Sequence, residues 1–224
     1  MSSFKALSIV KRRLQLKKVG HLGTLDPAAC GVLVLLCGRA TKLTNQLHAS
    51  TKVYRTLLIW GEETDTLDSE GQVVKHSDVL PTTEQIQAVL PSMVGEIEIE
   101  VPKFSAVHIQ GKRAYELARQ GIDFVPPTKV VTVTRFAMLD AAQCERDLAA
   151  LNEPFELPLH CSYFEIECQT GTYIRSLAKV LATRLGTLAT ADVIIRTRVG
   201  DFSLANTCQL DNVQLDVLQP IGGI

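Results

Sequence analysis

The spacing of apolar residues predicts an amphipathic helix at the start of the chain. Ser2 or Ser3 can cap this helix, and Lys and Arg side chains fall outside its apolar stripe, so the helix is expected to pack by one face. The stripe consists of Phe4, Leu7, Val10 and Leu14. Helical spacing recurs in three further segments, which are residues 40–47, 82–90 and 171–186.

Strands are predicted where apolar residues run together or alternate with polar ones. The run from Gly31 to Gly38 is apolar throughout and bounded by glycines, which predicts a central buried strand. Residues 96–101 alternate acidic and aliphatic side chains, as a half-exposed strand does. Further strands are predicted over residues 52–60, 129–139, 157–168 and 191–204, with a polar stretch around Asn152 to Pro154 before the third of these. The acidic, turn-rich segment 61–71 lacks calcium-loop spacing and is interpreted as structural.

Composition indicates an ordinary globular protein. The 224 residues are 46% hydrophobic and 21% charged, which allows one sizeable core, and we expect a single domain over 1–224. No apolar run approaches the roughly 20 residues that cross a bilayer, and no signal-peptide core is present, so a cytoplasmic protein without membrane association is expected. The six cysteines include no C-x-x-C pair, so neither a structural metal nor a disulfide framework is expected.

The net charge of −1 conceals a strong asymmetry. Residues 1–55 carry ten Lys or Arg and one acid, whereas residues 56–100 carry ten acids and one lysine. The basic segment is therefore a candidate footprint for phosphates, with Lys17 and Lys18 among its cations. The alternative is that the two segments pair with each other across the fold, and charge alone does not decide between them.

The one acid of the basic segment, Asp26, lies in a loop rich in glycine. A carboxylate alone among cations is expected to stay ionised. Glycines at 20, 23 and 31 allow sharp bends or close approach to a ligand, and Pro27 fixes the backbone directly after the acid. Such a loop can hold a carboxylate against a polyanion. The simpler alternative is that Asp26 only opens a turn before Pro27.

Residues 18–31, Lys-Val-Gly-His-Leu-Gly-Thr-Leu-Asp-Pro-Ala-Ala-Cys-Gly, resemble the signature loop of the TruB-type pseudouridine synthases, K-x-G-H-x-G-x-L-D-P-x-A-x-G. Further motifs of that family match in order. They are K-x-Y-R at 52–55, T-D-T-x-D-x-x-G at 64–71, P-x-Y-S-A followed by G-K-x-x-Y-x-x-A-R-x-G at 102–121, G-x-Y-I-R at 171–175, and L-R-R-x-x-x-G ending at 200. Phe104 replaces the usual tyrosine of the third motif.

The resemblance implies a fold, a reaction and a set of residues. The fold is α+β, with a mixed, mostly antiparallel sheet flanked by helices. The reaction converts uridine to pseudouridine in the T arm of tRNA after the base is flipped out of its stack. Since the family's reaction involves no redox change or hydrolysis, no metal or organic cofactor is implied. The implied roles are Asp26 as the catalytic residue, Tyr54 stacking on the target base, Arg175 pairing with Asp26, His21 stacking within the RNA loop, and Ile195 at the leucine position under the uracil pocket.

The resemblance also implies how the RNA is held. Residues near 102–127 would form an insertion that grips the T-arm stem-loop, with Lys112, Arg113 and Arg119 contacting phosphates. Lys17 and Lys18 of the basic segment would contact phosphates as well. Without the resemblance, the same insertion equally fits an exposed amphipathic helix. A monomer is expected.

Two features of the family's usual pattern have no match here. Only Met1-Ser2-Ser3 corresponds to the end of an N-terminal K-P-x-G-x-S-S motif, and we expect no counterpart of the C-terminal RNA-binding domain of many bacterial members in these residues. A noncatalytic tRNA-binding or tRNA-folding module therefore remains the main alternative. A glycoside hydrolase is a weaker one, because that chemistry usually needs two carboxylates flanking the bond and Asp26 is alone in the basic segment.

Overall fold

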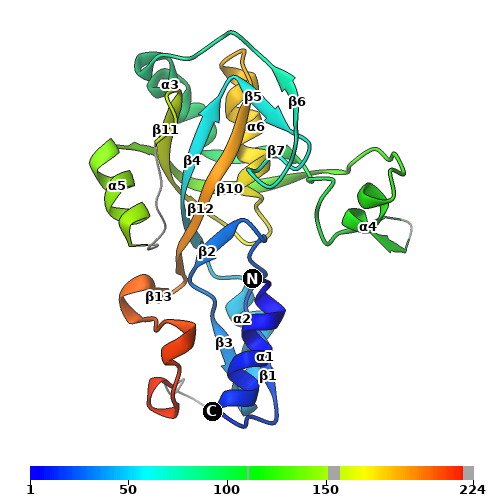
Figure 1. Ribbon diagram of the computed structural model, residues 1–224, viewed down its shortest axis with the longest axis vertical. Helices are drawn as coiled ribbons and strands as arrows, with labels where there is room; N and C mark the ends of the chain where they lie inside the picture. Colours follow the sequence, from blue (N-terminus) through cyan, green and yellow to red (C-terminus); the bar gives the residue numbers. More distant parts are fainter. Residues whose placement is uncertain (110, 151–156, 219–224) are drawn as a thin grey trace.

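The computed structural model describes residues 1–109, 111–150 and 157–218, so the polar stretch around Asn152 lies outside the described residues. The molecule is elongated, with a large sheet and its helices at one end and a smaller, mainly N-terminal part at the other (Figure 1). A segment containing α4 projects sideways from the sheet (Figure 1). No described helix is long and apolar enough to cross a bilayer.

The large sheet is mixed and mostly antiparallel, as expected. Its strand order is β13-β12-β4-β11-β10-β7, and β2 pairs with β12 as the parallel member. The strands are β2 (Ala29–Gly31), β4 (Lys52–Trp60), β7 (Gly95–Glu100), β10 (Thr128–Leu139), β11 (Cys161–Cys168), β12 (Ala189–Val199) and β13 (Phe202–Ser203). The prediction of a strand from residue 157 is wrong at its start, because β11 begins at Cys161.

Helices cover both faces of this sheet. The helix α6 (Ile174–Arg184) packs on one face with Leu177, Ala178 and Leu181 buried, as its spacing predicts. The helix α5 (Ala141–Ala149) packs on the other face through Cys144 and Leu148. Since alternate residues of a strand point to opposite faces, β4 contributes side chains to both layers. The central strand β4 is therefore held firmly from both sides.

The smaller part of the molecule has a core of its own. It contains α1 (Ser3–Arg13), β1 (Val19–His21), β3 (Leu35–Cys37), the 3-10 helix η1 (Gly38–Leu43) and α2 (Thr44–His48). Ser2 caps α1 by accepting a hydrogen bond from the Lys5 backbone N–H, at 3.2 Å. The predicted apolar stripe of α1 is wrong at Phe4, which is 72% exposed. Its buried face is instead made by Ser3, Leu7 and Val10.

The apolar run from Gly31 to Gly38 is not one central strand, contrary to the prediction. Its start belongs to β2 in the large sheet, and its end forms β3, which pairs with β1 in a separate two-stranded sheet. Gly31 has a φ of +102°, which turns the chain out of the large sheet. The apolar side chains then fill the second core, which contains Leu22, Val32, Val34, Leu36 and Val199.

The remaining elements connect or extend this framework. A hairpin of β5 (Glu62–Thr64) and β6 (Val73–His76) precedes α3 (Thr83–Val89), whose capping box joins Thr82 and Gln85, and η2 (Leu90–Met93) follows. Residues 102–109 and 111–127 project from the end of β7 and carry β8 (His108–Ile109), β9 (Lys112–Arg113) and α4 (Ala114–Arg119) (Figure 1). The last described turns are η3 (Leu204–Asn206), η4 (Leu210–Asn212) and η5 (Leu215–Val217).

Candidate active site

The loop that carries Asp26 joins β1 to β2 and is fastened at several points. The Leu22 N–H donates to the Val34 carbonyl at 3.0 Å, and the Ala29 N–H closes a turn by donating to the Asp26 carbonyl at 2.9 Å. The Leu25 N–H donates to the Ser3 hydroxyl of α1, also at 2.9 Å. The loop therefore has a defined shape before any ligand binds.

Asp26 and Arg175 form the pair that the family resemblance implies, although they are 149 residues apart. Nε and Nη2 of Arg175 each lie 2.9 Å from Oδ2 of Asp26. The arginine side chain is 1% exposed, whereas the aspartate side chain is 34% exposed. Because both nitrogens meet the same oxygen, Oδ1 remains available to a substrate. The buried guanidinium fixes a carboxylate that is open to solvent.

Arg175 is itself held by two other segments. Nη1 donates to the Thr66 carbonyl at 2.7 Å and lies 3.5 Å from Oδ2 of Asp68, and Nη2 donates to the Phe104 carbonyl at 3.2 Å. Asp68 is 3% exposed. Sequence reasoning missed Asp68 by treating residues 61–71 as structural. The match of this acidic segment to a family motif could have indicated that Asp68 belongs to the site. The segment contributes to the candidate site by holding Arg175.

A second buried arginine, Arg196, was also missed. It is 1% exposed, and its Nε and Nη2 donate to the carbonyls of Val32 at 2.8 Å and Gly23 at 3.1 Å. These contacts join β12 to both sides of the Asp26 loop. A side chain at Gly31 would place its Cβ 2.3 Å from the Arg196 carbonyl oxygen, so glycine is required there. The second arginine of the L-R-R-x-x-x-G motif was the available signal.

Tyr54 lies on β4 directly opposite Arg196 on β12 and is half-buried. Burial raises the pKa of its phenol, which the Arg196 cation opposes. Two residues earlier on the strand, Lys52 is buried, and its Nζ donates to the carbonyls of His48 and Ser50, each at 2.7 Å. Burial, followed by the Arg196 cation, lowers the pKa of Lys52. Tyr54 is thus a neutral ring beside the positive charge of Arg196.

His21 ends β1 at the entry to the Asp26 loop. Its side chain is half-buried, and Nδ1 has no hydrogen-bond partner among the described residues. Burial and, to a lesser extent, the Arg196 cation lower the pKa of His21. At neutral pH the imidazole is therefore uncharged, which suits stacking better than ion pairing.

Ile195 does not join these residues. It is buried on β12, between Ile194 and Arg196 in the sequence. Ile194 packs in the same core as Tyr54. Since successive side chains on a strand point to opposite faces, Ile195 points away from Tyr54. Counting back from Gly200 places the leucine position of L-R-R-x-x-x-G at Ile194, so the prediction for Ile195 was misplaced by one residue.

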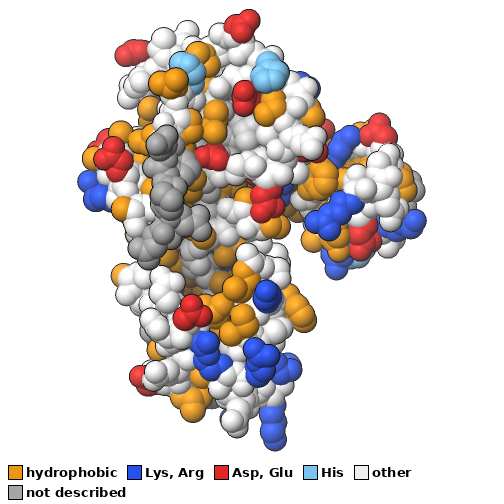
Figure 2. All heavy atoms as spheres, viewed as in Figure 1, with side chains coloured by type: hydrophobic (Ala, Val, Ile, Leu, Met, Phe, Trp, Pro, Cys, Tyr) orange, Lys and Arg blue, Asp and Glu red, His pale blue; other side chains and the backbone are white. Residues whose placement is uncertain are grey.

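The predicted RNA-backbone cations are all exposed, in two groups. Lys17 and Lys18 lie in the smaller part of the molecule, and Lys112, Arg113 and Arg119 lie on the projecting segment. Figure 2 shows Lys and Arg side chains on both parts, with an open notch between them. Within the described ranges, no ion pair joins residues 1–55 to residues 56–100, so the basic segment is not neutralised by the acidic one.

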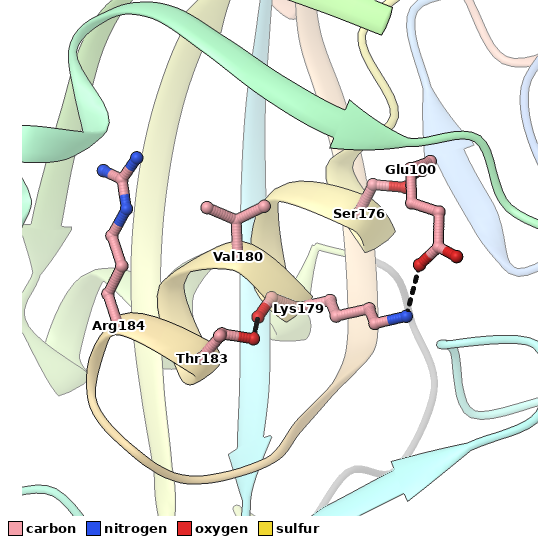
Figure 3. Close-up of a pocket in the computed structure, with 6 residues that line it drawn as sticks. All are labelled: Glu100, Ser176, Lys179, Val180, Thr183 and Arg184. Carbon is pink, nitrogen blue, oxygen red and sulfur yellow. Dashed lines mark hydrogen bonds and ion pairs between the residues drawn. The ribbon is translucent and has the colours of Figure 1, made fainter. Parts of the chain in front are cut away.

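A pocket beside α6 is lined by none of these site residues (Figure 3). It is lined by Glu100, Ser176, Lys179, Val180, Thr183 and Arg184. The Ser176 hydroxyl donates to the Glu100 carbonyl at 2.6 Å, and Nζ of Lys179 lies 2.5 Å from the Glu100 carboxylate. These contacts fasten α6 to the end of β7, where the projecting segment begins.

The mixed sheet, the helix that delivers Arg175 and the fastened Asp26 loop define a pseudouridine synthase-like fold. The sequence model described as "TruB family pseudouridylate synthase (N terminal domain)" matches residues 11–174. The chain is 39% identical over 214 residues to tRNA pseudouridine synthase B of Caulobacter vibrioides, an alignment that covers 96% of this chain and 64% of that protein. It is 37% identical over 211 residues to the protein of the same name from Ehrlichia canis, covering 94% and 65%.

The chain therefore belongs to the TruB family of pseudouridylate synthases, and the resemblance found in the sequence is confirmed. It spans 64–65% of the length of these two relatives. Among solved structures, it is similar to a chain of the "Crystal Structure of a Cbf5-Nop10-Gar1 Complex", with a TM-score of 0.62 and 27% identity, covering 91% of this chain and 46% of that one.

Proposed function

We propose that this chain converts uridine to pseudouridine in the T arm of tRNA, with Asp26 as its catalytic residue. The observation that carries the proposal is the half-exposed Asp26 carboxylate fixed by the buried Arg175 guanidinium. The relatives are named tRNA pseudouridine synthase B. A preorganised charged group suits a reaction in which a flipped base must be held while its glycosidic bond breaks.

The reaction is an isomerisation, so its atoms must balance within one nucleotide. The bond between C1′ of the ribose and N1 of uracil breaks, the base turns, and a bond forms between C1′ and C5. The proton on C5 is then lost and N1 gains one. Asp26 acts either as a nucleophile on the ribose or by abstracting a proton to give a glycal. Arg175 keeps the carboxylate oriented, and Tyr54 stacks on the turning base.

The surface around Asp26 favours a structured RNA as the substrate. Leu25, directly before Asp26, is bonded to Ser3 of α1, and Arg175 is bonded to Phe104 at the root of the projecting segment. These bonds tie the candidate site to both parts of the molecule that carry the exposed cations, and Figure 2 shows a notch between those two parts. We propose that residues 102–127 form an RNA-gripping insertion and that a T-arm stem-loop occupies the notch, with phosphates on both sides.

The geometry argues against the glycoside hydrolase alternative. A second carboxylate, Asp68, does lie near Arg175, but it is 3% exposed and accepts a hydrogen bond from the Thr66 hydroxyl at 2.6 Å. A buried, partnered carboxylate cannot flank a substrate bond together with Asp26. The noncatalytic RNA-binding alternative differs from the proposed function in predicting no turnover, so one assay distinguishes the two.

That assay measures tritium release from uracil C5 in an unmodified tRNA transcript mixed with stoichiometric protein. We expect release from the normal transcript and none from one in which the T-arm uridine is replaced by cytidine. Tyr54→Ala should slow single turnover at saturating RNA by about tenfold or more, which corresponds to about 1.4 kcal/mol of lost transition-state stabilisation. Tight binding without any release would instead identify a noncatalytic RNA-binding module.

The RNA footprint has a separate test with a matched control. Because phosphate contacts release counterions, binding of a T-arm stem-loop should weaken as salt rises. Lys17→Glu and Lys18→Glu should weaken binding and reduce its salt dependence. Arg146→Glu, an equal charge change on the exposed side of α5, should not. Equal losses for all three variants would contradict the proposed surface.

A further inference from the structure

The side chain of Lys129 on β10 has contacts that all converge on the turn before α6. Its Nζ donates a hydrogen bond to the Gly171 carbonyl and lies 4.9 Å from the centre of the Tyr173 ring. Burial lowers the pKa of its ammonium group. No carboxylate in the described ranges forms an ion pair with Lys129. Because burying a charge is costly, the position of this half-buried cation must be explained by contacts other than an ion pair.

The turn that Lys129 contacts leads directly into the candidate site. Gly171 has a φ of +81°, and a Cβ there would lie 3.0 Å from the lysine Nζ, so lysine and turn are closely packed. Tyr173 is the N-cap residue of α6 and makes no side-chain capping bond. Its ring packs against the core, and the Lys129 ammonium lies over the ring. Arg175 follows two residues later and holds Asp26.

A small displacement of this turn would move the groups that orient the carboxylate. The start of α6 contributes Arg175 to the site, and two nitrogens of this arginine hold the aspartate oxygen at 2.9 Å. Misplacement of reacting groups by about 1 Å costs up to roughly 100-fold in rate. The ammonium over the face of an aromatic ring and its bond to a carbonyl are both directional contacts that can prevent such a shift.

We infer that Lys129 is a positioning residue for the reaction, holding the turn at Gly171 and the Tyr173 ring so that Arg175 meets Asp26. This inference rests on the proposed function and deepens it. Lys129 does not touch the reacting atoms and is not required for RNA docking. In Lys129→Arg, the side chain keeps its positive charge and its hydrogen-bond donors, so it should still hold the turn. In Lys129→Met, the side chain keeps only the apolar stem and should not.

The experiment compares Lys129→Met and Lys129→Arg with wild type and with Arg135→Met. Arg135 is an exposed cation on the same strand that pairs with Glu165 on the face away from the site. Lys129→Met should slow single turnover at saturating tRNA by about tenfold, with RNA affinity within twofold of wild type. Lys129→Arg should restore at least half of the wild-type rate, and Arg135→Met should leave it unchanged.

A second measurement tests the positioning without using activity. Hydrogen–deuterium exchange of residues 169–176 should be faster in Lys129→Met and normal in Lys129→Arg. A wild-type chain that forms no pseudouridine would defeat the proposed function, and the exchange measurement would still test the inference. Unchanged exchange in Lys129→Met would overturn it. So would weakened RNA binding with an unchanged rate, which would instead make Lys129 a phosphate contact.

Discussion

Replacing Arg175 by methionine should lower both stability and turnover, because the arginine neutralises a buried acid and orients an exposed one. Its side chain is 1% exposed, and that of Asp68 is 5% exposed. Removing one partner of a buried ion pair typically costs about 3–5 kcal/mol. Asp68 keeps hydrogen bonds from the Thr66 hydroxyl and the Glu70 N–H, so the lower end of that range applies. Asp26 adds little, because its carboxylate can be hydrated instead.

The expected loss is therefore about 3 kcal/mol, or about 6–12 °C in melting temperature for a chain of this size. Domains of this kind have about 5–15 kcal/mol of stability, so the variant should remain folded. Urea unfolding and calorimetry measure the loss directly. Single turnover at saturating RNA should also fall by about tenfold or more, since the carboxylate loses its orientation.

The origin of the loss can be tested with a second substitution. In Arg175→Met, Asp68 is a buried charge without its cation, so adding Asp68→Asn should recover at least about 1 kcal/mol of stability. It should not recover turnover, which depends on Asp26. Arg184→Met, at the exposed end of the same helix, should cost less than about 1 kcal/mol. If Arg175→Met were no less stable than Arg184→Met, or if Asp68→Asn lowered the stability of the double variant further, the unpaired charge of Asp68 would not be the source of the loss.

Two further predictions concern the Asp26 loop. The pKa of His21 is lower in the folded chain than its unfolded value of about 6.5, so the folded state binds fewer protons and the free energy of unfolding should fall as the pH drops below about 6.5. In His21→Gln, urea unfolding at pH 7 and pH 5 should show a smaller fall, and an equal fall would exclude His21 as its source. Gly31→Ala should cost about 2–3 kcal/mol or more, because its Cβ would meet the Arg196 backbone. Gly38→Ala also adds a Cβ at positive φ but meets no atom within 4 Å, so a loss of only about 1 kcal/mol is expected and equal losses would contradict the steric argument.

Periodicity in the sequence predicted the parts of the fold in which one face of an element is buried. The buried face of α6 and the alternation of β7 followed the expected spacing. The prediction of one central strand from Gly31 to Gly38 was wrong because an apolar run shows only that a segment is buried. It does not show that the chain turns at Gly31 from one core into another. The prediction that Phe4 lies on the buried face of α1 was wrong because helical spacing does not reveal which neighbouring segments cover a face.

The candidate site could be predicted only where a motif names the residue. The resemblance brought Asp26 and Arg175 together across 149 residues, a contact that local patterns cannot foresee. Asp68 and Arg196 were missed because charged residues are normally expected at the surface, and their burial follows from contacts with segments distant in sequence. Both residues belong to motifs that match the family, so every residue of a matched motif should be treated as a candidate for the site.

The most direct test of the central claim is single turnover of an unmodified tRNA transcript by wild type and by Asp26→Asn, followed by tritium release from uracil C5. Asparagine keeps the size of the side chain and removes its charge. We expect release by wild type, no measurable pseudouridine from Asp26→Asn, and RNA affinities within a few-fold of each other. Turnover by Asp26→Asn at the wild-type rate would contradict the assignment of Asp26 as the catalytic residue.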